Sequence, residues 1–153
     1  FVFQFFNLLP VLTAEENILL PLKLAGREAD PERRRALIDA VGLGDRLSHR
    51  PAELSGGQQQ RVAIARALMS KPAVVFADEP TGNLDSKASA EVLDLLRRAV
   101  DEFGQTVVMV THDAGAAARA DRVLVLVDGR IVRDEAAGTV EQVHDLMKQP
   151  EAV

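Results

Sequence analysis

The chain has 153 residues, of which 47% are hydrophobic, and this is enough for one compact domain with a buried core. The formal net charge of −5 and the absence of Trp and Tyr argue against a nucleic-acid partner, because a phosphate backbone attracts basic surfaces and bases stack on aromatic rings. Cysteine is absent, which excludes disulfides, thiolate metal sites and thiol nucleophiles. The longest apolar runs have the length of strands, whereas a membrane-spanning helix needs about 20 apolar residues, so we expect any membrane role to depend on a partner.

The N-terminal part of the chain predicts the end of a strand followed by two helices. Phe1–Phe3 resembles the end of a strand, with neither an initiator Met nor a charged signal region before it, so we expect the chain to lack the start of its domain. Helices are expected over Ala14–Ala25 and Pro31–Val41, the second beginning with a proline behind Asp30 as its cap. Pro21 is expected to break or kink the first helix.

The middle of the chain predicts a parallel sheet. A helix is expected over Gly57–Ser70, followed by an apolar strand at Ala73–Ala77, a helix over Ser86–Phe103 and a second apolar strand at Thr106–Val110. Continuous apolar runs are typical of strands buried on both faces of a sheet. A strand, helix, strand unit forms a parallel pair, and ligands gather beyond the carboxyl ends of such strands. The sequence therefore places the chemistry after these two strands.

The last part of the chain predicts a hairpin and a closing helix. Arg122–Val127 and Arg130–Arg133 flank an Asp-Gly turn, and Val140–Met147 has helical spacing. The hairpin is expected to be structural. The expected fold class is therefore α/β.

Polar residues follow both predicted strands. Asp78 and Glu79 come directly after the first strand, where one carboxylate could organise a hydrated Mg²⁺ while its neighbour polarises a water. His112 follows the second strand and could hydrogen-bond a terminal phosphate or hold the attacking water. Taken singly, the acidic pair is equally compatible with a solvated turn, and a lone His at a strand end is more often a cap.

The segment Leu54–Gln58, with the sequence Leu-Ser-Gly-Gly-Gln, precedes the third helix. Its two glycines let the backbone come close to a ligand, Ser55 supplies a hydroxyl, and the helix N-terminus directs amides and a partial positive charge at an anion. This combination predicts phosphate recognition. The alternative is an ordinary Ser-Gly-Gly helix cap.

These elements together resemble the motifs of ATP-binding-cassette (ABC) transporter ATPases, and the resemblance covers nearly the whole chain. The matching positions stand in the family's order: Gln4 resembles the Q-loop glutamine, Leu54–Gln58 the signature motif, Val74–Asp78 with Glu79 the Walker B strand and catalytic glutamate, Asn83–Asp85 the D-loop and His112 the switch histidine. The segments Phe3–Pro10 through Asn17 and Ala77–Asp85 are most similar to the branch of lipoprotein-release, macrolide-export and cell-division ATPases.

The resemblance implies a fold, an activity and partners. The fold would be a P-loop NTPase-like parallel sheet core, incomplete at its start, with a helical subdomain over about residues 5–70, which holds the Q-loop and the signature, and the rest of the catalytic core over 71–153, which ends in a β-hairpin. The activity would be ATP hydrolysis coupled to transport, with ATP and Mg²⁺ as cofactors. The partners would be a second ATPase subunit in a head-to-tail dimer and an integral membrane permease subunit, which places the protein in the cytoplasm at the inner face of the membrane.

The resemblance also assigns roles to single residues. Asp78 and Gln4 would hold the metal, Glu79 would be the general base, and Gln4 would also contact the attacking water. His112 would bridge to the γ-phosphate. The residues that would act across the dimer, closing over the partner's ATP or joining the two sites, are Ser55, Gly56, Gly57, Gln58 and Asp85.

One part of the family's pattern is missing. No Gly-x-x-x-x-Gly-Lys-Ser/Thr segment occurs, since none of the ten Gly residues precedes a Lys. We therefore expect a C-terminal piece of such an ATPase, without the Walker A loop that grips phosphates. The alternative is that the chain by itself is a non-catalytic partner-binding module without ATP binding. A soluble cassette ATPase of repair or translation fits less well, because such proteins usually carry two cassettes or long insertions.

Overall fold

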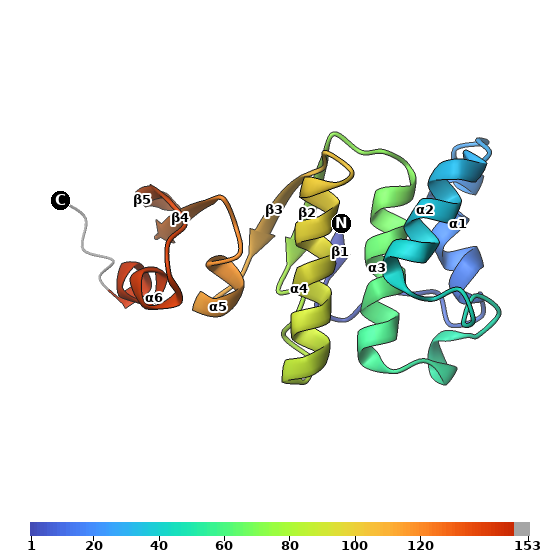
Figure 1. The fold of residues 1–153 in the computed structure, drawn as a ribbon, viewed down its shortest axis with the longest axis horizontal. Coiled ribbons are helices and arrows are strands. Elements are labelled where there is room, and N and C mark those ends of the chain that lie inside the picture. Colours follow the sequence, from blue (N-terminus) through green and yellow to red (C-terminus); the bar gives the residue numbers. More distant parts are fainter. Residues whose placement is uncertain (149–153) are drawn as a thin grey trace. The chain divides into compact units, whose positions relative to one another are not determined.

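The computed structural model describes residues 1–148, and its contacts divide the chain into two compact units, Phe1–Val110 and a second that starts at Thr111. The first unit contains β1 (Val2–Phe3), α1 (Ala14–Leu24), α2 (Pro31–Val41), a 3-10 turn (Pro51–Glu53), α3 (Gly56–Met69), β2 (Val74–Asp78), α4 (Ser86–Asp101) and β3 (Thr106–Val110) (Figure 1). The second contains α5 (Ala114–Ala117), β4 (Arg122–Val127), β5 (Arg130–Ala136) and α6 (Val140–Lys148). These bounds lie close to the predicted ones, and the α/β prediction is confirmed.

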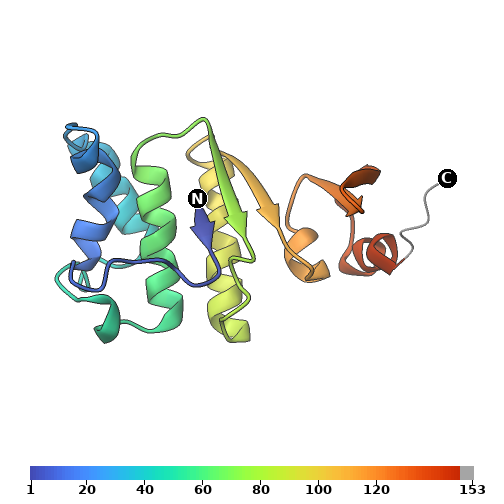
Figure 2. The ribbon, with the colours of Figure 1, turned by 180° about the vertical axis from the view of Figure 1, so that it is seen from behind.

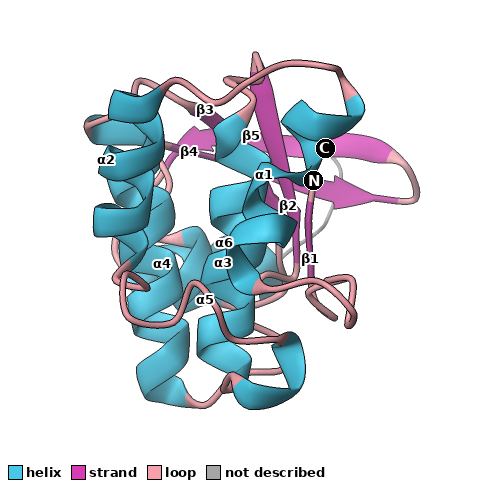
Figure 3. Ribbon diagram, turned by 90° about the vertical axis from the view of Figure 1, so that its right-hand side faces the viewer, coloured by secondary structure: helices cyan, strands magenta, loops and turns pink. Residues whose placement is uncertain are grey.

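The three strands of the first unit form one parallel sheet in the order β1-β2-β3. Phe3 pairs with Asp78, and Asp78 pairs with Val110, so all three strands end at the same level. Figure 3 shows β1 and β2 running side by side. The strand, helix, strand pattern predicted this arrangement for β2 and β3, and the structure adds β1, so the loops that follow all three strands begin at one edge of the sheet.

Helices α3 and α4 cover one face of this sheet (Figure 2). Val75 and Ala77 are each 1% exposed on that side, whereas Val74 and Phe76, which alternate with them along β2, are 37% and 44% exposed. The prediction that the strands are buried on both faces is therefore wrong for the described residues. A run of apolar residues shows that a strand could be buried on both sides, but the neighbouring elements decide whether it is.

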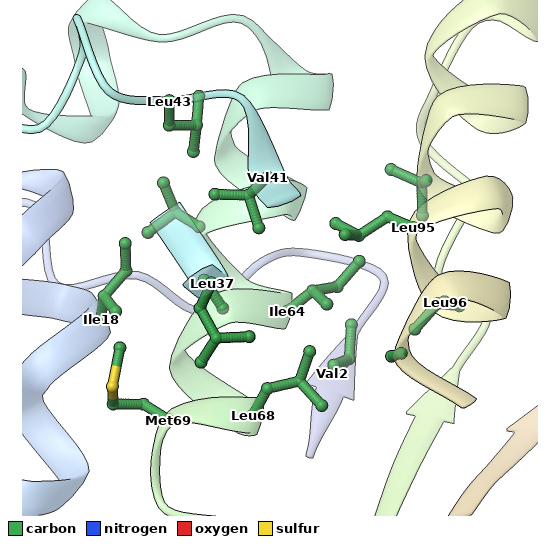
Figure 4. Close-up of a cluster of buried hydrophobic side chains, with 14 of the residues drawn as sticks. Val2, Ile18, Leu37, Val41, Leu43, Ile64, Leu68, Met69, Leu95 and Leu96 are labelled. Carbon is green, nitrogen blue, oxygen red and sulfur yellow. The ribbon is translucent and has the colours of Figure 1, made fainter. Parts of the chain in front are cut away.

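The core of the first unit surrounds α3, which lies between α1 and α2 on one side and α4 on the other (Figure 1). Figure 4 shows its side chains Ile64, Leu68 and Met69 among residues of the surrounding helices and of β1. Of the hydrophobic residues of α3, only Ala67 is not fully buried. Such a helix is held by packing on all sides rather than by its own propensity.

Local side-chain caps explain where α1 and α2 begin. Thr13 and Glu16 form a reciprocal capping box at the start of α1, and the Asp30 side chain accepts a hydrogen bond from the Glu32 amide at 3.1 Å at the start of α2. We expected a break or a kink at Pro21, and a break is wrong, since α1 continues to Leu24. A proline removes one amide donor, and this helix tolerates that loss close to its end.

The predicted hairpin is confirmed in the second unit, where β4 and β5 are antiparallel. Strand β5 extends beyond the predicted end to Ala136. The Arg122 guanidinium donates two hydrogen bonds, of 2.6 and 2.5 Å, to the Asp134 carboxylate and thereby lowers the pKa of that carboxyl group. No helix in residues 1–148 has the length and apolar character needed to cross a membrane.

We expect Leu68→Ala to lower the free energy of unfolding by about 2–5 kcal/mol, because it leaves a cavity in the centre of the first unit. Leu68 is 1% exposed, whereas Leu24 is 79% exposed, so Leu24→Ala is the matched control and should change stability by less than about 0.5 kcal/mol. Chemical denaturation of the purified protein measures both. Equal losses for the two variants would contradict the central position of α3.

Candidate functional site

The side chain of Gln4 lies against the turn that follows β2. Its Nε2 donates to Asn83 Oδ1 at 3.3 Å, and Asn83 Nδ2 donates to the Gln4 carbonyl at 3.2 Å. A Cβ atom on Gly82 would lie 2.8 Å from Gln4 Nε2, so a larger residue at position 82 would push the Gln4 side chain aside. The structure thus brings the loop after β1 together with the loop after β2.

Asp78 and Glu79 lie at the carboxyl end of β2 and adopt different backbone conformations. Asp78 is the last residue of the strand, whereas Glu79 has a positive φ of 43°, which turns the chain sharply. The Glu79 amide donates to the Val110 carbonyl at 2.9 Å, and its own carbonyl accepts from the Gly82 amide at 3.1 Å. A left-handed conformation at a non-glycine residue costs about 1–3 kcal/mol and persists where the surroundings hold it. The two hydrogen bonds hold it here.

The start of α3 is built by Ser55–Gln58. Ser55 Oγ accepts a hydrogen bond from the Gln58 amide at 3.3 Å, and the Ser55 amide donates to Gln58 Oε1 at 2.8 Å. The helix cap that we considered as an alternative is therefore present. Ser55 is also exposed at the helix N-terminus, so the cap does not prevent it from meeting an anion, and phosphate recognition stays a prediction.

The two glycines of this segment pack directly on the start of α4. A Cβ atom on Gly57 would lie 2.9 Å from the Ala88 Cβ, and one on Gly56 would lie 3.4 Å from a methyl group of Leu84. Asp85 begins α4 as its cap, with Oδ1 accepting from the Ala88 amide at 2.9 Å. Within one chain, then, the signature segment and the D-loop segment are neighbours.

Two residues of α3 that the sequence analysis missed hold the loops of the site. Gln60 is fully buried, and its Nε2 donates to the carbonyl of Phe3 at 3.1 Å and to that of Pro80 at 2.6 Å. Arg66 donates to the carbonyls of Asn7 and Phe6 at 2.6 and 3.0 Å, and burial lowers the pKa of its guanidinium. The sequence did contain a signal for such residues. A polar side chain at a helix position that faces the core by its spacing is expected to bind a buried polar group.

Asn17 holds the next part of the same loop. This residue is fully buried, and its Oδ1 accepts from the Leu9 amide at 2.8 Å while its Nδ2 donates to the carbonyls of Leu9 and Thr13 at 3.1 and 3.0 Å. One amide side chain thereby satisfies several backbone groups that the loop cannot pair by itself. The segment between Gln4 and α1 is fixed at both ends.

His112 lies in the second unit, two residues after Val110, and is exposed. The following Asp113 caps α5, with Oδ1 accepting from the Ala116 amide at 2.6 Å. The capping role at this strand end therefore belongs to Asp113. That His112 acts at the same site as Glu79 stays a prediction.

The oxygen atoms near the edge of the sheet fit Mg²⁺ as a partial ligand set. No group of three or more His, Cys, Asp or Glu side chains within residues 1–148 could hold a metal ion. Mg²⁺, however, usually takes only one or two protein oxygens together with waters and phosphate oxygens. Asp78 ends β2 beside the end of β1, and the Nε2 of Gln4 donates to Asn83, which leaves Oε1 as the atom of this side chain that could bind a metal ion.

Two hollows of the surface lie apart from these residues. One of about 380 Å³ is lined by residues at the start of α1 and in the loop after α2, and one of about 460 Å³ is lined by residues of β5 and α6. Neither is lined by Gln4, Asp78 or Glu79. The candidate residues lie at an edge of the sheet, where loops and a helix N-terminus supply polar groups.

Known proteins share both the sequence and the fold of the chain. A family model described as ABC transporter matches residues 1–82. An ABC transporter ATP-binding protein of Thermotoga maritima is 54% identical over 92% of this chain and 60% of its own length. The lipoprotein-releasing system ATP-binding protein LolD of Syntrophotalea carbinolica is 56% identical over 86% of this chain and 59% of its own length. The macrolide export ATP-binding/permease protein MacB of Brucella melitensis is 52% identical over 88% of this chain and 21% of its own length.

A solved structure has the same fold. The dimeric post-hydrolysis state of the ATP-binding cassette MJ0796, bound to ADP and Pi, matches with a TM-score of 0.72 and 44% identity, over 90% of this chain and 62% of that one. The chain thus spans about 60% of the length of the Thermotoga relative and of this cassette. The predicted architecture of parallel sheet, helices and C-terminal hairpin is confirmed.

We expect Gly57→Ala to destabilise the protein by about 1–3 kcal/mol, because the new methyl group would overlap with Ala88. Ala88→Gly in the same chain removes the atom that the methyl group meets and should restore the part of the loss that exceeds the cost of about 1 kcal/mol for a glycine inside α4. Gly44→Ala is the control, because nothing lies within 4 Å of its added Cβ. Thermal denaturation of the four proteins measures the effect, and a double variant no more stable than Gly57→Ala would contradict the contact.

Proposed function

Because this chain belongs to the ABC transporter family, as its motifs predict, we propose that the whole protein binds and hydrolyses ATP and couples this reaction to the movement of a membrane partner. One observation carries the proposal. Gln4 and Glu79 each follow one of the paired strand ends Phe3 and Asp78, and the Gln4–Asn83 hydrogen bonds hold the two loops together. In this proposal, hard oxygen donors and a general base would share one edge of a parallel sheet.

Each residue at this edge has a distinct proposed role. Asp78 and the Oε1 of Gln4 would hold Mg²⁺, which when bound neutralises charge on the phosphate oxygens. Glu79 would accept the proton of the attacking water, and Gln4 would help to orient that water. His112 would hydrogen-bond the terminal phosphate. The left-handed turn at Glu79 supports its role, because strained backbone is concentrated at functional sites.

A second ATPase subunit would complete the site. Ser55, Gly56, Gly57 and Gln58 would close over ATP held by that subunit, and Asp85 would join the two sites. The exposed Ser55 at the N-terminus of α3 supports this arrangement, since such termini attract anions. MJ0796, which is similar to this chain, is dimeric in its solved structures.

The relatives favour a type of transporter. LolD is named for a lipoprotein-releasing system and MacB for macrolide export, and both are more than half identical to this chain where they match. We infer an export or lipoprotein-release system in which the protein lies in the cytoplasm against an integral membrane permease. Within the chain, about residues 5–70 would form the helical subdomain that meets the permease, and 71–153, of which 149–153 lie outside the described residues, would belong to the catalytic core.

In the whole protein we expect Glu79→Gln to lower the ATPase rate by about 10²–10⁴-fold, because the amide cannot accept a proton from water. ATP binding should remain, and an ATP-bound dimer should accumulate, which light scattering after size exclusion detects. Glu28→Gln makes the same chemical change at an exposed residue before α2 and is the control. Unchanged turnover in Glu79→Gln would contradict the assigned role.

The alternative function is a partner-binding module without nucleotide binding, and it is favoured for the 153-residue chain alone by the absence of a Gly-Lys pair. We expect titration calorimetry of this chain with Mg-ATP to show no saturable binding up to millimolar concentration, because no P-loop lysine or hydroxyl is available to grip the phosphates. ADP and AMP serve as controls for weak adenine binding. Saturable binding specific to ATP would contradict this expectation.

A further inference from the structure

The buried amide of Gln60 joins two segments that are far apart in the sequence. Its Nε2 lies 3.1 Å from the Phe3 carbonyl and 2.6 Å from the Pro80 carbonyl, and the side chain is 0% exposed. Both neighbours are acceptors, so the end of the amide that faces them must be the NH₂ group. One donor group therefore holds two backbone carbonyls together.

These two carbonyls belong to residues directly beside the proposed catalytic ones. Phe3 precedes Gln4 and pairs with Asp78, and Pro80 follows Glu79. Beyond the sheet, the two loops are linked again by the hydrogen bonds between Gln4 and Asn83. Loss of the Gln60 donor would remove one of the two sets of side-chain hydrogen bonds that fix the loop after β2 relative to the loop after β1.

The same helix holds the continuation of the first loop through Arg66. Its guanidinium donates to the carbonyls of Phe6 and Asn7, two non-glycine residues with φ of 58° and 48°. Arg66 is therefore placed to keep this loop in a conformation that it would not adopt freely. Helix α3, which begins at the signature segment, contacts both loops of the site by side-chain hydrogen bonds.

The other end of the Gln60 amide has no such partner. Its Oε1 is buried and accepts no hydrogen bond from the residues that the structure describes. A buried acceptor without a partner costs folding free energy, and an apolar side chain of the same shape would avoid that cost. The two donated hydrogen bonds therefore account for the amide donor at this position.

We infer that Gln60 is a positioning residue for ATP hydrolysis: it sets the separation of Gln4 and Glu79 and links both to the signature helix. This inference rests on the proposed function. Gln60 touches neither substrate nor metal in the proposed site, and it acts through the backbone of Phe3 and Pro80.

The test is Gln60→Met in the whole protein, which keeps the length of the side chain and removes the donor. Gln105→Met is the matched control, because Gln105 is also a buried amide, 7% exposed, and donates to the carbonyls of Pro72 and Thr106 at 3.0 and 3.2 Å. Those carbonyls lie at the amino ends of β2 and β3, whereas the proposed site lies at the carboxyl ends of the strands. The two variants therefore lose the same kind of bond at the two ends of the sheet.

We expect kcat for ATP hydrolysis to fall at least about tenfold in Gln60→Met, since a misplacement of about 1 Å at a reacting centre costs up to about 100-fold. KM for ATP and the melting temperature should change as little as in Gln105→Met, which should keep its kcat. Amide hydrogen exchange should become faster in both 3–7 and 79–83 in Gln60→Met, and around 72–74 in Gln105→Met. Equal kcat in the two variants, or faster exchange in only one of the two loops, would overturn the inference.

Gln60→Leu provides a second variant if the methionine variant does not fold, because it also removes the donor and buries no charge. Failure of both to fold while Gln105→Met folds would make Gln60 a stability residue and would also overturn the inference. The proposed function fails differently: the unaltered protein would then lack ATPase activity, and Glu79→Gln would change nothing, whatever happens at Gln60.

Discussion

The burial of α3 is the constraint on which the first unit depends. The hydrophobic side chains of this helix lie in the core except for the partly buried Ala67, and α1, α2, α4 and the sheet all pack around it. Its first turn comes so close to α4 that Gly57 has no room for a side chain beside Ala88. The segment proposed to meet the partner's ATP therefore starts on the most enclosed helix of the unit. A rigid helix in this place would transmit a displacement at its N-terminus to the loops that its side chains hold.

Buried amide side chains hold the loops, whose backbone groups are not paired within a helix or a sheet. Asn17, Gln60 and Gln105 are the buried polar residues among those that the structure describes, and each donates to backbone carbonyls outside its own element or at its edge. Loops carry backbone groups that no helix or sheet pairs, and burial of such groups requires a partner. The positive φ angles at Phe6 and Asn7 occur in a loop held in this way. Strain and its compensation thus lie together at the proposed site.

The sheet shows that the local sequence pattern does not determine which faces of a strand are covered. Both apolar strands predicted a sheet covered on both faces, yet Phe76 and Val110 are 44% and 58% exposed, and Phe1 stacks on Phe76 with ring centroids 5.3 Å apart on the exposed side. An apolar run shows that a strand can be buried on both faces. Whether each face is buried depends on the helices and strands that pack against it. The same limit applies to Pro21, where a strong local signal for a helix break was overridden inside α1.

The sequence by itself determined the order and approximate bounds of the helices and strands, because caps, turns and periodicity act over a few residues, as Asp30 with Pro31 and the Asp128-Gly129 turn show. It also determined the family, because the motifs and their order can be read from the sequence without a structure. Only the tertiary structure decided that Gln60 and Arg66 hold the loops of the site and that Gly57 meets Ala88. These contacts join residues that are tens of positions apart, and a side chain's partner at that separation is set by how the helices and strands pack, which no local pattern contains.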